Sequence, residues 1–248
     1  MAAADQLIQE ITKEITALPT GRYGEVIFDE DLFRDLPAPE AYLAPGPDVL
    51  AGLDEAFLLG ELAEHPSLLG CYVPMHSPGR IFLIRRNLHR FYWSLVGSLR
   101  HGLPYLFPLD LEGALHLVVK KTDQHEQFHF QSDVLRQLFR RPCDPLLEEA
   151  LAVAWSRIKI LEEPWNSKIG RMNRVLYNRL LDANFAYRSP GYCDWSKYAD
   201  APRFKDAWLD YLSPPNYHSL QGNGVSNLQD LMFGQLGQIR GGCVDRLV

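Results

Sequence analysis

The chain has 248 residues, of which 46% are hydrophobic and 23% charged, and its formal net charge is -6. A globular protein of this size buries a substantial core in one large domain or two small ones. The acidic balance argues against a general nucleic-acid binder, and the absence of a run of 18 apolar residues argues against a membrane span.

The first third of the chain carries helical, irregular and β signals in turn. Apolar residues recur at helical spacing between Leu7 and Leu18, which predicts an amphipathic helix over 4–17. Clustered prolines over 36–47 indicate an irregular connector, and helical spacing returns over 48–63. Short apolar runs at 69–74 and 80–85 flank a Ser-Pro-Gly turn, so they predict a β-hairpin.

The middle of the chain reads as helix, strand and two further helices. We expect a helix over 87–101, a third strand over 114–119, and a helix from Asp123, as its N-cap, to Phe139. Pro142 ends that helix. Asp144 is then a good N-cap for a helix that continues to about Leu161, because a proline follows it in the first turn.

The last third is expected to be mainly helical. Helix signals cover about 167–185, 202–212 and 225–237, a Pro-Pro turn stands at 214–215, and a final strand is predicted over 242–247. The fold class predicted from these elements is α+β. We divide it into an N-terminal segment (1–68), a core (69–162) and a mainly helical C-terminal part (163–248).

Residues 125–129 read His-Glu-Gln-Phe-His, which is an H-E-x-x-H motif. On a helix the two histidines are four residues apart and lie on one face, so both imidazoles can reach a single metal ion. Glu126 follows the first histidine and projects beside them. A hydrolytic zinc site needs three protein ligands and one open position. Glu149, on the next predicted helix, is the third ligand we expect, and Glu148 is the alternative.

These motifs resemble the gluzincin metallopeptidases, the thermolysin-like zincins. The resemblance covers about residues 69–162, and it includes the segment Glu148-Glu149-Ala150-Leu151-Ala152, which looks like the glutamate helix of that family. It implies a zincin-like fold, in which a small mixed sheet precedes the active-site helix and the glutamate helix. It further implies Zn²⁺ bound by His125, His129 and Glu149.

The resemblance also implies the chemistry. Glu126 would be the general base that activates a zinc-bound water, and the substrate would be a peptide or protein whose peptide bonds are cleaved. An extended substrate would pair with a strand edge of the sheet. No nucleic-acid or membrane partner is expected. The four cysteines form no C-x-x-C pair, so we expect reduced thiols in a cytoplasmic protein.

Two departures from the family pattern concern the groups around the metal. Many gluzincins place an aspartate one turn after the ligand glutamate, and here that position is Val153. Another group must therefore orient the imidazoles, with Asp123, Asp133 and Asp182 as candidates. The family also uses a downstream histidine or tyrosine to stabilise the oxyanion. The candidates for that role are Tyr177, Tyr187, Tyr192, Tyr198, Tyr217 and His218.

Several alternatives stay open at the level of sequence. The chain could be a catalytically inactive zincin-fold binding or regulatory protein, a peptidase specific for one protein partner, or a helical interaction protein in which the motif is accidental. Lys120, Lys121 and Arg157 could neutralise a substrate carboxylate, although ordinary solvated charges are the simpler interpretation. The stretch from Tyr187 to Tyr198 is interpreted first as a packed loop and second as a wall of the substrate cleft.

Overall fold

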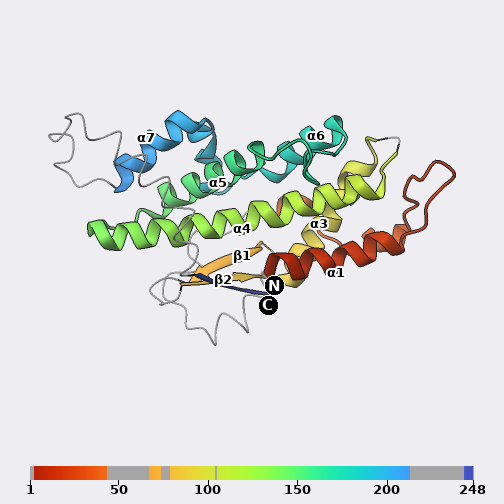
Figure 1. Cartoon of the computed structure of the whole chain (residues 1–248), viewed down its shortest axis with the longest axis horizontal. Coiled ribbons are helices and arrows are strands. Elements are labelled where there is room, and N and C mark those ends of the chain that lie inside the picture. Colours follow the sequence, from red (N-terminus) through yellow and green to blue (C-terminus); the bar gives the residue numbers. More distant parts are fainter. Residues whose placement is uncertain (1–2, 44–66, 74–78, 104, 213–242, 248) are drawn as a thin grey trace.

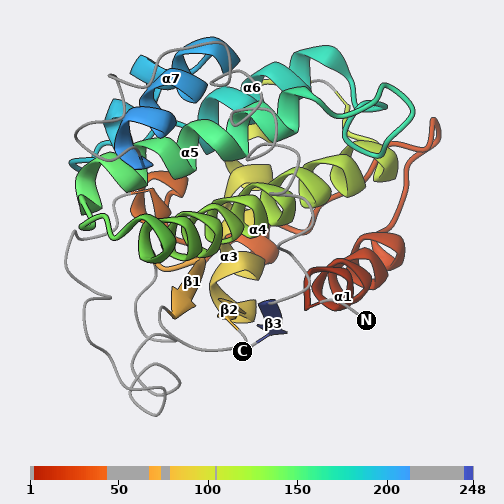
Figure 2. The ribbon, with the colours of Figure 1, turned by 60° about the vertical axis from the view of Figure 1, so that its left-hand side comes forward.

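The computed structural model describes residues 3–43, 67–73, 79–103, 105–212 and 243–247. Within these ranges the fold is α+β and mostly helical, with one small mixed sheet. The long helix α4 (Pro108–Phe139) lies between two layers, as the two ribbon views agree (Figures 1 and 2). One layer contains the sheet and α1 (Ala3–Ala17), and the other contains α5 (Pro145–Leu161), α6 (Arg174–Asn184) and α7 (Ala201–Leu212).

The sheet has three strands in the order β1-β2-β3, namely β1 (Gly70–Val73), β2 (Gly79–Leu83) and β3 (Cys243–Leu247). β1 and β2 pair antiparallel, which confirms the predicted hairpin. β3 pairs parallel with β2, with Cys243 opposite Gly79, and this confirms the predicted final strand. β1 and β2 pack against α4, so the sheet supports the helix that carries the H-E-x-x-H motif.

The strand predicted over 114–119 is wrong, because these residues form part of α4. The helix begins at Pro108, where the Asp110 carboxylate accepts a hydrogen bond from the Phe107 backbone N–H at 3.2 Å. Asp123 is consequently inside the helix and is not its N-cap. An apolar run buried on every side has the same sequence signature in a helix and in a strand, and five of these six residues are buried.

The other helices follow their sequence signals more closely. α1, α5 and α7 occupy the expected ranges, as does α3 (Arg85–Arg100). α6 is shorter than expected, since it begins only at Arg174, where the Asn173 side chain caps the backbone N–H of Val175. The helices expected over 48–63 and 225–237 and the turn at 214–215 lie outside the described residues. Short 3-10 helices cover Glu30–Phe33 (η1), Pro39–Tyr42 (η2) and Tyr192–Tyr198 (η4).

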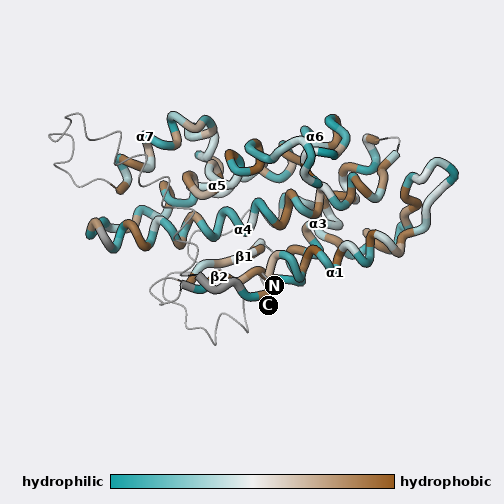
Figure 3. The backbone as a smooth tube through the Cα atoms, viewed as in Figure 1, coloured by the Kyte–Doolittle hydropathy of each residue, from teal (hydrophilic) through white to brown (hydrophobic). Residues whose placement is uncertain are grey.

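The buried side chains of α4 contribute to two apolar clusters. The larger cluster joins α4 to α1, α3, α6 and the sheet, and the second joins it to α5 and α7 through Phe128 and Trp208. Hydrophobic and hydrophilic residues are therefore interspersed along the whole of α4 (Figure 3). Among the described residues, no helix is both long and apolar enough to cross a membrane. The boundaries at residues 68 and 162 stay a prediction.

Candidate metal centre

Two helices bring the predicted ligands together. α4 presents His125 and His129 one turn apart on the face that packs against α5. Arg140, in the left-handed conformation with φ 53°, ends α4, and the Asp144 carboxylate caps α5 by accepting a hydrogen bond from the Leu147 N–H at 3.2 Å. The short connection turns α5 back along α4. Glu149 then lies opposite the two histidines.

The three side chains converge on one point. The Nε2 atoms of His125 and His129 are 3.2 Å apart, and the Oε2 atom of Glu149 lies 3.1 Å from the first and 3.3 Å from the second. In a tetrahedral zinc site with bonds of about 2.0–2.1 Å, neighbouring ligand atoms are about 3.3–3.4 Å apart. The group His125, His129 and Glu149 therefore has the size and the donor set of a site that could hold a metal ion.

The charges of this cluster favour a cation. Burial acts to raise the pKa of Glu149, but the two neighbouring imidazoles lower it well below its usual value, so the carboxylate is ionised. Burial acts to lower the pKa of His129, yet Glu149 and Glu148 together raise it well above its usual value. Burial lowers the pKa of His125. A position between carboxylates that attracts a proton this strongly also attracts a metal ion, which binds in exchange for the proton.

Glu148 contacts His129 on the Nδ1 side of its imidazole ring. Its Oε1 atom lies 3.0 Å from Nδ1 of His129, so the ring can donate from Nδ1 and direct Nε2 at the other two ligand atoms. The Oε2 atom of Glu148 lies 2.9 Å from Nε of Arg136 and accepts a hydrogen bond from the Tyr211 hydroxyl. Glu148 is thus placed to orient His129, a candidate ligand, because its Oε1 atom lies against Nδ1 of His129, away from the Nε2 that faces the other candidate ligands.

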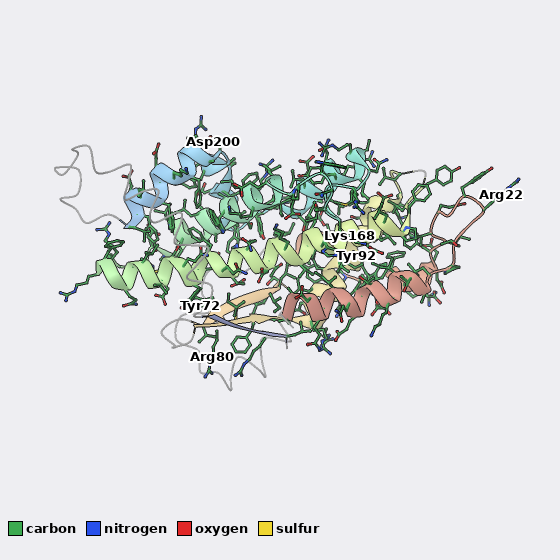
Figure 4. The ribbon with its side chains drawn as sticks, in the orientation of Figure 1. Arg22, Tyr72, Arg80, Tyr92, Lys168 and Asp200 are labelled. Atoms are coloured by element: carbon green, nitrogen blue, oxygen red, sulfur yellow. The ribbon has the colours of Figure 1, made fainter. Side chains whose placement is uncertain are left out.

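The three aspartates proposed for this orienting role do not fill it. Asp123 accepts a hydrogen bond from the Gln127 side chain at 2.7 Å, and Asp133 accepts one from the Tyr72 hydroxyl at 2.9 Å. Tyr72 points from β1 toward α4 (Figure 4). Asp182 is exposed on α6. Sequence reasoning missed Glu148 because it compared the two neighbouring glutamates only as rival ligands.

The support from Glu148 has a measurable consequence. Replacing Glu148 with Gln removes its charge from Nδ1 of His129, and we expect zinc affinity to fall about 10- to 100-fold, the usual effect of losing such an orienting group. Competition with a chromophoric chelator measures the dissociation constant. Glu162→Gln is the matched control, because that exposed carboxylate at the end of α5 pairs only with Lys159 in the described structure. Equal affinities in the two variants would contradict the role of Glu148.

Glu126 lies on the side of α4 that faces β1. Its carboxylate accepts a hydrogen bond from the Tyr72 backbone N–H. Gly70 allows this close approach, since a Cβ atom there would lie 2.9 Å from Cγ2 of Thr122 and 3.0 Å from Cγ of Glu126. Burial raises the pKa of Glu126 to about 8, and Glu149 adds to the effect. Glu126 is therefore a buried carboxyl group, electrostatically influenced by His129 and Glu149, that can exchange a proton near neutral pH.

Tyr192 packs on the ligand cluster, the group of candidate ligands formed by His125, His129 and Glu149. Its ring stacks on the His125 imidazole, with 5.8 Å between centroids and 14° between planes, and Tyr187 packs against it with 5.2 Å between centroids. Gly191 makes this possible because it has φ 80°, and a Cβ atom there would lie 2.9 Å from the Leu146 carbonyl oxygen. Burial and Glu149 raise the pKa of Tyr192 well above its usual value, so its hydroxyl stays a hydrogen-bond donor.

The remaining tyrosine candidates lie elsewhere. Tyr177 contacts the Arg174 guanidinium, and Tyr198 packs on the cluster around Phe128. Tyr217 and His218 lie outside the described residues. The stretch from Tyr187 to Tyr198 is therefore both a packed segment, through Trp195 against Phe185, and a wall of the ligand cluster, through Tyr192.

The two neighbouring lysines before the motif differ sharply. Lys120 forms an ion pair with Glu163. Lys121 is 1% exposed, and its Nζ atom has no hydrogen-bond partner among the described residues. Its ammonium lies 4.6 Å from the ring centroid of Tyr187, 5.3 Å from that of Phe91 and 5.7 Å from that of Phe185. The interpretation of Lys121 as a solvated charge is wrong.

This chain matches no family model, no curated protein and no solved structure. Its membership of the gluzincins and its zincin-like fold therefore stay predictions, supported by the motif and by the convergence of its residues. The three cysteines whose side chains are described, Cys71, Cys143 and Cys193, are free thiols.

Proposed function

We propose that this protein is a zinc-dependent hydrolase that cleaves peptide bonds in a peptide or protein substrate. The observation that supports this most strongly is the convergence of His125, His129 and Glu149, with their ligand atoms 3.1–3.3 Å apart. The buried carboxyl group of Glu126 is electrostatically influenced by His129 and Glu149. Two imidazole nitrogens and one carboxylate oxygen are the ligands of a familiar class of catalytic zinc site. Three protein ligands leave a coordination position for water or substrate.

Zinc in this site would polarise a substrate carbonyl and lower the pKa of water toward about 7. Glu126 is then the proton carrier: it takes a proton from the attacking water and delivers it to the leaving amine. Its pKa of about 8 in this environment falls when a divalent cation is near, so that the ionised base is present at neutral pH. Glu148 keeps the His129 ring in place throughout.

Tyr192 supplies the remaining requirement of amide hydrolysis, a donor to the oxygen on which negative charge develops. Its phenol is protonated, and its ring is fixed by stacking on His125. A donor that is positioned before the reaction stabilises the charged transition state without reorganisation. Among the six candidates from the sequence, Tyr192 therefore has the best-supported position for this role.

Metal content tests the proposal. Elemental mass spectrometry of the purified protein is expected to find about one zinc per chain, the stoichiometry of a single three-ligand site. His129→Ala and Glu149→Ala should each lose it. His116→Ala is the matched control, since His116 lies on the same helix and outside the ligand cluster, and it should keep its zinc. A wild type that takes up no zinc, or ligand variants that keep it, would overturn the proposal.

The second candidate function is a catalytically inactive zinc protein that binds or regulates a partner. The burial of the site favours it, because Glu126 is 6% exposed and His125 is 8% exposed, which limits the approach of a large substrate. In that case zinc would stabilise the contact between α4 and α5. Stoichiometric zinc without cleavage of any peptide in a broad library would select this function over hydrolysis.

A further inference from the structure

Lys121 is the one buried ammonium among the described residues that neither the metal centre nor an ion pair explains. Burying a charge without a counter-ion is costly, and an apolar side chain would fill the same space at a lower cost in stability. The three surrounding rings compensate only in part through cation–π contacts. A lysine kept in such a site, where a bound carboxylate would stabilise its protonated form, points to a ligand of opposite charge.

The position of Lys121 connects it to the metal centre. Lys121, His125 and His129 stand four residues apart in turn, so they form one stripe along α4. Lys121 and His125 are therefore one helical turn apart. Tyr187 links them physically, because its ring contacts the ammonium on one side and Tyr192, which stacks on His125, on the other.

We propose that the Lys121 ammonium binds a carboxylate of the substrate next to the scissile bond. This inference rests on the proposed hydrolase function and adds a substrate class to it. One helical turn rises about 5.4 Å, and an extended peptide advances about 3.3–3.6 Å per residue. A carboxylate bound at Lys121, one helical turn from His125, would therefore belong to a residue close to the bond that is cleaved. It is either the C-terminal carboxylate of a peptide or an aspartate or glutamate side chain.

Tyr187 lies against the Lys121 ammonium, with its ring centroid 4.6 Å from Nζ. This tyrosine is only partly buried, and it lies in the connection between α6 and η4, outside both helices. It covers an ammonium that is 1% exposed. A carboxylate that reaches Nζ takes the place of the Tyr187 ring and exchanges a cation–π contact for a charge-assisted hydrogen bond, which is the stronger interaction.

Peptide binding to a variant that is expected not to turn over substrate tests the inference independently of catalysis. Zinc-loaded Glu126→Gln protein is titrated calorimetrically with two pairs of N-acetylated peptide pools. The first pair consists of tripeptides with a free C-terminal carboxylate and the same tripeptides with a C-terminal amide. The second pair consists of C-amidated pentapeptides with a central Asp or Glu and the same peptides with Asn or Gln. A preference within the first pair identifies a C-terminal carboxylate, and one within the second pair identifies an acidic side chain.

We expect one charged pool to bind about 10- to 100-fold more tightly than its neutral partner, the effect of one hydrogen bond to a charged group. Introducing Lys121→Met into the Glu126→Gln protein should abolish the preference for the charged pool. Adding Lys120→Met should preserve it, since the neighbouring ammonium pairs with Glu163. Lys121→Gln serves as a second neutral variant of similar length, and thermal unfolding verifies that each variant is folded.

Equal binding within both pairs, or a preference that survives Lys121→Met and Lys121→Gln, would overturn the inference. The proposed function fails separately and visibly. If the wild-type protein binds zinc and prefers a carboxylate through Lys121 but cleaves neither pool, the anion subsite stands and the hydrolase does not. If wild type cleaves peptides with no dependence on Lys121, the hydrolase stands and the subsite does not.

Discussion

The Glu126→Gln variant is expected to hydrolyse peptides about 10²–10⁴ times more slowly than the wild type, the range attributed to a single general base. Its zinc content should be unchanged, because Glu126 contributes no ligand to the triad. The amide is nearly isosteric with the carboxyl group, and its oxygen can still accept the Tyr72 N–H. Initial rates on any peptide that the wild type cleaves, measured together with elemental analysis, provide both readouts.

The Glu163→Gln variant controls for the removal of a nearby negative charge. Glu163 pairs with Lys120 and lies outside the ligand cluster, so its rate should match that of the wild type. Normal turnover by Glu126→Gln would show that another group moves the proton. Loss of zinc from Glu126→Gln would mean that the glutamate supports the ligands structurally, and the assignment of a base would then be wrong.

The second large effect concerns stability as a function of pH. Burial lowers the pKa of Lys121 from 10.5 to about 7, so the folded protein releases a proton that the unfolded chain keeps between these values. Because the unfolded state binds more protons in that window, the free energy of unfolding rises with pH there. One pKa unit is equivalent to about 1.4 kcal/mol, so the contribution of Lys121 reaches several kcal/mol. It is fully present above the unfolded pKa and is lost as the pH falls to about 7 and below.

Lys121→Met removes this dependence and should therefore be more stable than the wild type at pH 6.5. The difference should shrink steadily toward pH 9.5. Denaturant unfolding of both proteins across this range, with zinc present throughout, measures it. Tyr187, which contacts the ammonium, and His125, whose pKa the ammonium lowers, are present in both proteins. Parallel pH profiles for the two proteins would contradict the prediction.

Much of the fold follows from local patterns in the sequence. The hairpin is predicted because two short apolar runs flank a Ser-Pro-Gly turn, and α5 because Asp144 and Pro145 mark its first turn. The strand predicted over 114–119 is wrong because of the packing around this segment, which its own residues do not reveal. Layers pack on both sides of α4, so its apolar residues lack the one-sided periodicity that identifies a helix.

The candidate site also has a part that can be predicted from the sequence and a part that cannot. The motif spacing is enough to predict that His125 and His129 share a helix face, and the return of α5 brings Glu149 to them. The roles of Glu148 and Tyr192 depend on directions that a sequence does not specify. Two consecutive helix positions point about 100° apart. This angle separates an orienting carboxylate from a ligand, and it separates the buried Lys121 from Lys120, which pairs with Glu163.

The position of Tyr192 has a different origin. It depends on the backbone at Gly191, whose positive φ and close approach to α5 carry the chain over the ligand cluster. In a sequence, a glycine before an aromatic residue is compatible with many local structures and does not predict a position beside a metal site. Only the packing of η4 against α5 gives this one its place beside His125.

The parallel pairing of β3 has a consequence for how the protein acquires its structure. Cys243 and Gly79, which are partners in the sheet, are separated by most of the chain. Contacts this distant in sequence form slowly, because a long loop must close before they contribute. Until β3 arrives, the hairpin presents the unpaired edge of β2, a template for pairing with other chains. During folding, aggregation therefore competes with docking of β3, and shortened forms of the chain that lack residues 243–247 keep that edge open permanently.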